Sequence, residues 1–194
     1  MAFANRYPGG TELEISMLFV DVRGSTRLAE EMTAAEFGQL MNRFYKVATD
    51  VLIRTDAIID KLVGDEVIGL FLPIFTGPDH AGPAVLAAQE LLVATGHAQK
   101  EGPWLPIDIG VHTGLVFVGT VSGAEDSVTD ITALGDNVNV TARLASMAAP
   151  GEALISESAY ATGGAHFGEL DRRELELKGR SELVAARVLT VPVA

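Results

Sequence analysis

Two aspartates stand where carboxylates could bind cations. Asp21 ends the mostly apolar run 15–22, which predicts a strand buried on both faces. Asp65 follows a glycine between the apolar runs 58–63 and 67–72, a pattern that predicts a β-hairpin with glycine in its tight turn. A strand end and a hairpin turn can share one edge of a sheet. Two carboxylates meeting there could hold two hard cations, which usually keep waters and bind substrate phosphates.

Each aspartate also has an ordinary structural explanation. Asp21 could cap a helix that begins near Ser25, because an aspartate oxygen accepts hydrogen bonds from the free N–H groups of a first helical turn. Asp65 could be present only as a favoured turn residue. Taken alone, the spacing favours these structural explanations, because aspartate is common at both kinds of position.

The segment Gly24-Ser25-Thr26 follows the first strand directly. It could present backbone N–H groups at a helix N-terminus to a phosphate, although any strand-to-helix turn can have this composition. Other chemistries find less support. The four histidines are scattered, and the serines lack the G-x-S-x-G context of a hydrolase. The glycines of 110–119 follow strand spacing with no helix after them, which makes a dinucleotide-binding fold a poor match.

Composition excludes several classes of protein. The 194 residues carry 14 Lys and Arg against 26 Asp and Glu, a net charge of −12, and they include no cysteine. Disulfides, zinc ribbons, iron–sulfur clusters and thiol nucleophiles are therefore excluded. The acidic balance argues against a nucleic-acid partner, which would need clustered Lys and Arg. With 48% hydrophobic residues, a sizeable core is expected.

The chain reads as one domain over 11–194 behind a loose N-terminal lead over 1–10. No apolar stretch approaches the roughly 18 residues that a membrane span needs, and no secretory signal is visible. We therefore expect a soluble cytoplasmic protein with no membrane partner.

The remaining patterns predict the elements that position the two aspartates. Thr33 and Glu36 form a capping box at the start of a helix with an apolar stripe through Val51. The other predicted elements are a helix over 78–100, paired strands over 107–112 and 116–121 around Thr113 and Gly114, a helix over 137–147, and strands over 174–177 and 183–191. Paired strands interleaved with helices indicate an α+β fold with a mainly antiparallel sheet flanked by helices.

Several segments together are far more specific than any one of them. They are FVDVRGST at 19–26, KLVGD at 61–65, IGVHTG at 109–114, LGDNVNVTAR at 134–143 and LKG at 177–179. In this order and spacing they resemble the class III adenylate/guanylate cyclase catalytic domain, from about residue 14 to residue 189. The resemblance implies a ferredoxin-like nucleotidyl cyclase domain that acts on a nucleoside triphosphate.

The resemblance implies roles for the residues at the sheet edge. Asp21 and Asp65 match the two metal-binding aspartates of the family, with the Val22 carbonyl as a third contact, so two divalent cations, Mg²⁺ or Mn²⁺, are expected as cofactors. Gly24, Ser25 and Thr26 match a substrate-binding segment. The family more commonly has Gly-Phe where this chain has Gly24-Ser25, a change that keeps the backbone contacts to phosphate but alters local packing.

Further residues match positions that contact the nucleotide. Lys61 and Thr132 match the pair that contacts the purine, Asn139 and Arg143 match the pair that orients the ribose and stabilises charge at the α-phosphate, and Lys178 matches a lysine that contacts the triphosphate. Taken singly, Lys61 could protect a sheet edge, Thr132 could simply favour a strand, and Asn139 and Arg143 could be exposed polar residues of a helix. Their coincidence favours the functional interpretation.

The purine pair indicates ATP as the substrate. A lysine can donate to adenine N1 and a hydroxyl can accept from the adenine amine, whereas guanine reverses both groups. The expected reaction is conversion of ATP to 3′,5′-cyclic AMP and pyrophosphate. Thr132 stands where the family often has aspartate, which marks a threonine-bearing subset and implies activation by bicarbonate.

The resemblance also implies a homodimer with shared active sites. The alternatives are a non-catalytic cyclase-like regulatory domain that binds nucleotide, and a diguanylate cyclase. A regulatory relative typically lacks a metal aspartate or the Asn/Arg pair, and both are present here. Against a diguanylate cyclase, Val63 stands where a second glycine would precede Gly64-Asp65.

Overall fold

The structure is a computed structural model of the chain that describes residues 9–122, 129–176 and 183–193. Lys178 and the LKG segment lie outside the described residues, as does most of the predicted N-terminal lead. In chain order the elements are β1 (Thr11–Val22), α2 (Ser25–Glu31), α3 (Ala34–Arg54), β2 (Ile58–Val63), β3 (Glu66–Phe71), α4 (Pro73–Thr76), α5 (Ala81–Ala94), β4 (Ile107–Ser122), β5 (Thr129–Leu134), α6 (Asp136–Met147), β6 (Ala153–Ser156), α7 (Glu157–Gly163), a 3-10 helix (Gly164–Phe167), β7 (Asp171–Leu175) and β8 (Val184–Leu189).

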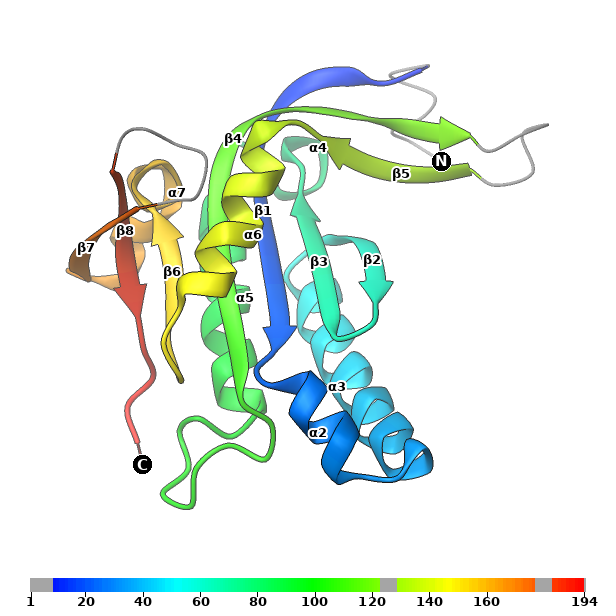
Figure 1. Ribbon diagram of the computed structural model, residues 1–194. Helices are drawn as coiled ribbons and strands as arrows, with labels where there is room; N and C mark the ends of the chain where they lie inside the picture. Colours follow the sequence, from blue (N-terminus) through cyan, green and yellow to red (C-terminus); the bar gives the residue numbers. More distant parts are fainter. Residues whose placement is uncertain (1–8, 123–128, 177–182, 194) are drawn as a thin grey trace.

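Within the described residues the strands form one eight-stranded sheet (Figure 1). The strand order is β2-β3-β1-β4-β6-β8-β7, and β5 pairs with β4 off this path. Every pairing is antiparallel except that of β4 with β6. The prediction of an α+β fold with a mainly antiparallel sheet is confirmed.

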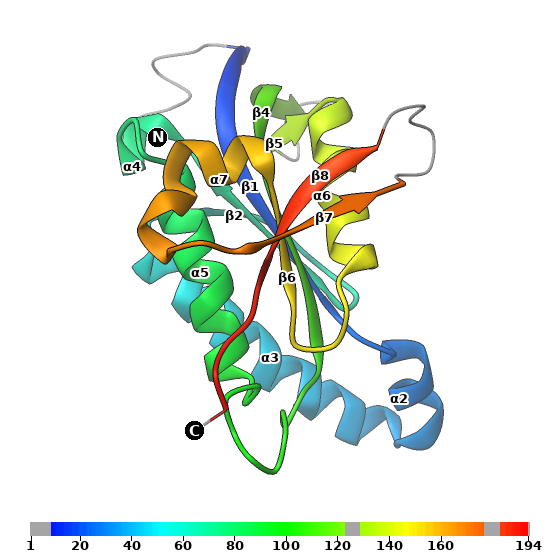
Figure 2. The same cartoon turned by 90° about the vertical axis from the view of Figure 1, so that its left-hand side faces the viewer.

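Helices cover both faces of the sheet (Figure 2). Helices α3 and α5 pack on one face, against Leu18 and Val20 of β1, and α6 lies on the other face, over Met17 and Phe19. Successive strand residues point to opposite faces, so a strand covered on both sides must be apolar at every position. The continuous apolar run of β1 is explained by the helices that cover both of its faces.

The predicted capping box is confirmed at the start of α3. The Thr33 side chain accepts from the Glu36 N–H at 3.3 Å, and a Glu36 carboxylate oxygen accepts from the Thr33 N–H at 2.9 Å. These bonds satisfy two of the free N–H groups of the first turn. The helix then buries Phe44, Ala48 and Val51 of its apolar stripe against the sheet.

The predicted hairpin around Thr113 and Gly114 is wrong. β4 runs unbroken from Ile107 to Ser122, and its later part pairs antiparallel with β5. The glycines serve packing, because α6 lies directly on them. A Cβ at Gly110 would stand 2.4 Å from the Ala145 nitrogen, and one at Gly114 would stand 2.6 Å from Asn137 Cγ.

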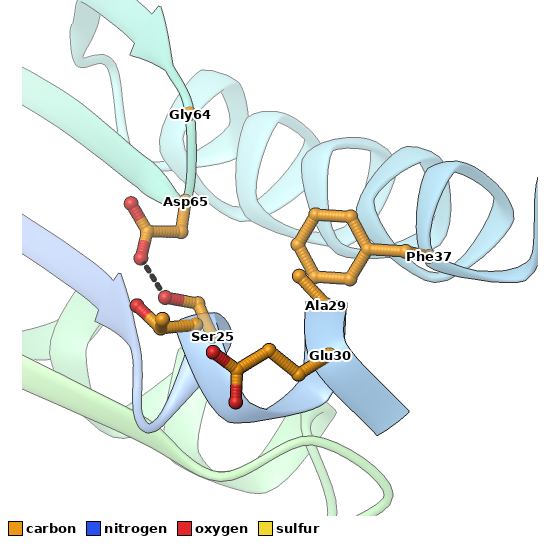
Figure 3. Close-up of a pocket in the computed structure, with 7 residues that line it drawn as sticks. Ser25, Ala29, Glu30, Phe37, Gly64 and Asp65 are labelled. Carbon is orange, nitrogen blue, oxygen red and sulfur yellow. Dashed lines mark hydrogen bonds between the residues drawn. The ribbon is translucent and has the colours of Figure 1, made fainter. Parts of the chain in front are cut away.

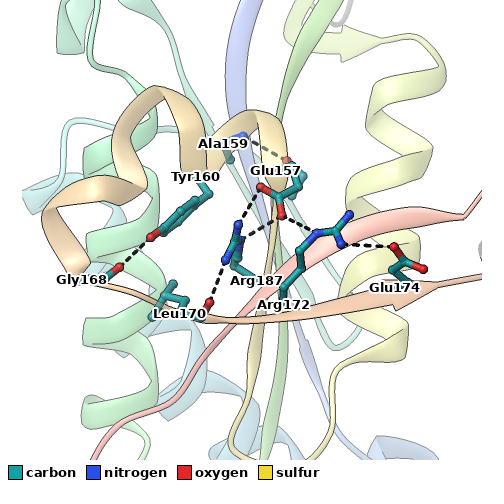
Figure 4. Close-up of polar contacts among 9 residues, drawn as sticks. Glu157, Ala159, Tyr160, Gly168, Leu170, Arg172, Glu174 and Arg187 are labelled. Carbon is teal, nitrogen blue, oxygen red and sulfur yellow. Dashed lines mark hydrogen bonds and ion pairs between the residues drawn. The ribbon is translucent and has the colours of Figure 1, made fainter.

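The C-terminal strands are bound to α7 by charged side chains (Figure 4). Glu157, the first residue of α7, accepts from Arg172 of β7 at 3.2 Å and from Arg187 of β8 at 2.9 Å. The Arg187 guanidinium also lies 4.7 Å from the centre of the Tyr160 ring. These contacts stabilise β7 and β8, the strands on the side of the sheet away from the two aspartates.

Across the described ranges, no helix combines the length and the apolar composition needed to span a membrane.

Candidate active site

The structure brings Asp21 and Asp65 together. The end of β1 and the β2–β3 turn lie at the same end of the sheet, beside α2 (Figure 1). Asp21 pairs in register with Glu66 of β3, and the Val22 N–H donates to the Asp65 carbonyl at 3.1 Å. The two carboxylates therefore share one edge of the sheet, as the strand and hairpin patterns predict.

Burial, together with nearby negative charge, perturbs Asp21. Burial raises its pKa to about 7, and the nearby charges of Asp65 and Glu66 contribute to the rise. Burial, followed by the charge of Asp65, also raises the pKa of Glu66. Asp21 Oδ1 is buried without a hydrogen-bond partner in the described structure. An unsatisfied buried carboxylate oxygen beside a second carboxylate suits a hard divalent cation, which would offset the repulsion.

Any cation here would draw on few protein side chains. Within the ranges that the structure describes, no three His, Cys, Asp or Glu side chains converge in an arrangement suited to a metal ion. Asp21 and Asp65 would therefore be joined by backbone oxygen, water or substrate phosphate. Such mixed coordination is usual for Mg²⁺ at phosphate-transfer sites.

The interpretation of Asp21 as a helix cap is wrong. The N-cap residue of α2 is Gly24, which has a left-handed φ of 69°. No side chain forms a capping hydrogen bond at this helix start. Glycine adopts this conformation without the steric cost that a Cβ would bring. Asp21 therefore has no role at the start of α2, and its carboxylate remains at the sheet edge.

A pocket of about 480 Å³ opens beside Asp65 (Figure 3). The Ser25 hydroxyl donates to an Asp65 carboxylate oxygen, and the Tyr45 hydroxyl donates to the Gly64 carbonyl. These bonds bind the β2–β3 turn to α2 and α3. The residues that line the pocket are Ser25, Thr26, Ala29, Glu30, Phe37, Gly64 and Asp65. Two of the three residues of the predicted substrate segment thus face the same space as Asp65.

The predicted purine pair lies on two strands, β2 and β5, that pack against each other. Lys61 of β2 is exposed, whereas Thr132 of β5 is buried. The link between the strands is Asp60, a buried carboxylate that accepts a hydrogen bond from the Thr132 hydroxyl at 3.3 Å. Asp60 was not among the residues predicted from the sequence. The signal for it is a carboxylate directly before Lys61 in an otherwise apolar strand.

Asn139 and Arg143 lie four residues apart on α6, so they share one face of the helix. Asn139 is exposed and Arg143 is half-buried. Neither side chain forms a hydrogen bond or ion pair with Asp21 or Asp65 within the described parts of this chain. The structure therefore presents two separate groups of predicted site residues, one at the sheet edge and one on α6.

Side chains that the sequence analysis missed hold α6 at both ends. At its start, His112 Nε2 and Asn137 Oδ1 lie 2.9 Å apart, and Asn137 donates to the Leu115 carbonyl at 2.8 Å. At its end, the Arg23 guanidinium donates to the Ala148 carbonyl and to Asp108 Oδ1, the second at 2.7 Å. Arg23 stands two residues after Asp21, so it joins the turn after β1 to the end of α6.

Comparison with known proteins places the chain in a family. Residues 10–189 match the family model described as the adenylate and guanylate cyclase catalytic domain. Two Mycobacterium tuberculosis relatives are the uncharacterized proteins Rv1320c and Rv1318c. They are 31% and 28% identical to this chain over 95% and 91% of it. The chain spans about a third of the length of each, 32%.

Similar solved structures include both nucleotide specificities. The guanylyl cyclase Cya2 is 25% identical with a TM-score of 0.83, and the match covers 96% of this chain and 95% of that one. The adenylyl cyclase CyaB from P. aeruginosa is 28% identical with a TM-score of 0.78, covering 94% and 96%. The family match and these folds lead to one conclusion: the chain belongs to the class III adenylate and guanylate cyclase catalytic domain family.

Proposed function

We propose that the chain is an adenylate cyclase domain, spanning residues 11–194, that converts ATP to 3′,5′-cyclic AMP and pyrophosphate. The observation that carries this proposal is the meeting of Asp21 and Asp65 at one edge of the sheet, in a member of the cyclase family. The raised pKa of Asp21 and its unsatisfied Oδ1 support a metal-binding role for the pair.

Asp21 and Asp65, with the Val22 carbonyl, would hold two divalent cations, Mg²⁺ or Mn²⁺. Bound there, the cations would lower the pKa of the attacking hydroxyl and neutralise charge on the attacking and leaving oxygens. Gly24 lies in the turn after β1, and Ser25 and Thr26 begin α2 next to these carboxylates. Their backbone N–H groups are proposed to orient the triphosphate.

The base pocket is proposed to recognise adenine. The Lys61 ammonium donates to adenine N1, and Thr132 Oγ1 accepts from the exocyclic amine. Guanine presents a donor at N1 and an acceptor at C6, so both contacts would fail. The exposed position of Lys61 leaves its ammonium able to reach a base.

The remaining roles concern the sugar and phosphates. Asn139 orients the ribose, so that the 3′-oxygen attacks the α-phosphorus in line with the pyrophosphate leaving group. The new O3′–P bond closes the ring, the bond to pyrophosphate breaks, and the hydroxyl proton passes to solvent. Arg143 stabilises the charge that develops on the phosphoryl oxygens, and Lys178 contacts the triphosphate.

Two subunits are proposed to share each site. Among the described residues of one chain, Asn139 and Arg143 form no hydrogen bond or ion pair with Asp21 or Asp65, which suits a site completed by a second copy. The arm formed by β4 and β5 also leaves apolar side chains exposed, among them Leu115, Phe117 and Leu134. A twofold interface would cover this apolar surface and create two equivalent sites. Thr132 further suggests that bicarbonate stimulates the activity.

The test is an assay of the purified chain with ATP or GTP and either Mg²⁺ or Mn²⁺, with cyclic products separated by chromatography. We expect cyclic AMP as the main product and its loss in Arg143→Ala, an enzyme whose predicted metal aspartates are intact. Production of cyclic GMP alone would overturn the choice of base. No cyclic product from a folded dimer would favour the non-catalytic regulatory alternative.

A further inference from the structure

Asp60 is a buried carboxylate at an irregular point of β2. The pairing of β2 with β3 shifts register between Ile59 and Lys61, so Asp60 is the extra residue of a β-bulge. Bulges turn a side chain away from the regular strand alternation. The Asp60 side chain is only 8% exposed, while the next residue, Lys61, is exposed.

The Asp60 carboxylate contacts a residue of the proposed base pocket. Thr132 is 5% exposed, and its Oγ1 donates to Asp60 Oδ2 at 3.3 Å. A threonine hydroxyl has one proton to donate and two lone pairs that accept, whereas an ionised carboxylate only accepts. While the Thr132 hydroxyl donates its proton to the Asp60 carboxylate, Thr132 Oγ1 can only accept a hydrogen bond from another group.

We propose that Asp60 selects adenine by fixing the Thr132 hydroxyl as an acceptor. This inference rests on the proposed function and adds to it a positioning residue that determines base specificity. Adenine places an amine at C6, which donates to the fixed oxygen. Guanine places a carbonyl there, and two acceptors then face each other without a proton between them.

A threonine without Asp60 would discriminate weakly. A free hydroxyl can rotate, so that it accepts from the adenine amine or donates to the guanine carbonyl. The preference for adenine over guanine comes from the Asp60 carboxylate, because a hydroxyl that donates to Asp60 cannot also donate to the guanine carbonyl. Loss of one such matched hydrogen bond corresponds to a change of about tenfold in relative specificity.

The test is a double-mutant cycle on kcat/KM for ATP and GTP, using Asp60→Asn, Thr132→Val and the double variant. Asparagine keeps the shape of aspartate but can donate to Thr132 Oγ1, which frees the hydroxyl proton. We expect Asp60→Asn to lower the ATP/GTP ratio of kcat/KM by about tenfold. In the Thr132→Val background, where no hydroxyl remains, the same substitution should leave the ratio unchanged.

Two controls separate this role from a structural one. Asp56→Asn makes the same chemical change at an exposed residue with a left-handed φ of 62°, which asparagine tolerates, and should leave the ratio unchanged. Thr132→Ser keeps the hydroxyl and should retain the preference for ATP that Thr132→Val loses. If Asp60→Asn does not fold, this serine and valine comparison tests the same pair from its other side.

Binding provides a readout without turnover. Calorimetry with 3′-deoxy-ATP and 3′-deoxy-GTP, which lack the attacking hydroxyl, should show the same tenfold loss of base preference in Asp60→Asn. An unchanged preference in that variant, or an equal change in the Thr132→Val background, would overturn the inference.

The proposed function can fail separately. A wild-type chain that produces no cyclic AMP overturns the proposed function, and the calorimetric preference still decides the inference. A wild-type adenylate cyclase that loses its base preference in Lys61→Glu but keeps it in Asp60→Asn overturns the inference alone.

Discussion

At the scale of single residues, the site is dominated by two carboxylates that repel each other. Asp21 is partly buried beside Asp65 and Glu66, and its pKa rises to about 7. Proteins retain such electrostatic costs mainly where function needs them. The meeting of Asp21 with Asp65 was predictable from the sequence, because a strand end and a tight hairpin turn are both local patterns. Asp60 was not, since its partner Thr132 lies 72 positions away.

The raised pKa of Asp21 predicts how stability depends on pH without metal. From about pH 4 to about pH 7 the unfolded chain ionises this group while the folded chain keeps it protonated. The folded state then binds more protons, so its stability should fall as pH rises through this window and level off above it.

Thermal unfolding of the wild type and Asp21→Asn in a chelator checks this pH dependence. The variant should gain in melting temperature relative to the wild type as pH rises from about 4 to about 7. At about pH 8, Mg²⁺ should raise the melting temperature of the wild type much more than that of the variant. A constant difference across the pH range would mean that Asp21 does not titrate there.

Lys61 should control the choice of base. Lys61→Glu places an acceptor at this position. This acceptor would oppose the N1 acceptor of adenine, but it would accept from the N1–H donor of guanine. We expect cyclization of ATP to fall by at least about tenfold more than cyclization of GTP. Steady-state kinetics with both nucleotides measures the ratio. If ATP and GTP activities fall equally, Lys61 does not contact the base. Full conversion is not expected, because Thr132 still favours adenine.

At the scale of elements, α6 is positioned by its close contact with β4. A helix can lie this near to a strand only where side chains are absent, and Gly110 and Gly114 supply that space. The sequence suggested a turn at Thr113 and Gly114 instead. Glycine has the same local signature in both settings, and α6 itself begins only at Asp136. The presence of most strands and helices and the α+β class were predictable from periodicity, but the contact between α6 and β4 was not.

Gly110→Ala should displace α6. The added Cβ would lie 2.4 Å from the Ala145 nitrogen and 2.5 Å from the Thr141 carbonyl oxygen, both backbone atoms that cannot rotate away. Overpacking of this kind typically costs about 1–3 kcal/mol. We expect a lower free energy of unfolding in denaturant, and a loss of activity at temperatures where the variant remains folded, because Asn139 and Arg143 move with the helix.

Gly38→Ala is the matched control. Gly38 lies within α3, and a Cβ there would meet no atom within 4 Å. The same substitution should therefore stabilise the chain by about 0.5–1 kcal/mol, because alanine favours a helix over glycine. Destabilisation by both substitutions, or by neither, would show that contact with α6 does not decide the effect at Gly110.

At the scale of the whole molecule, one chain presents two separate groups of predicted site residues, which we propose to be half-sites. Asp21 and Asp65 lie at the sheet edge beside α2, whereas Asn139 and Arg143 lie on α6. In a twofold dimer, the first group of one subunit would face the second group of its partner. Arg23 connects the two groups of predicted site residues, because it lies two positions after Asp21 in the chain and donates to the Ala148 carbonyl at the end of α6.

Complementation between two variants that are each expected to be inactive tests the proposed sharing of the cyclase site most directly. Asp65→Ala removes one half-site and Arg143→Ala the other, so each homodimer should be inactive. After free exchange of an equal mixture, about half of the dimers are mixed, and each mixed dimer has one intact site of two. About a quarter of the wild-type rate of cyclic AMP formation should therefore return. No recovery in a mixture shown to contain heterodimers would contradict the proposed sharing, because each subunit would then hold a complete site.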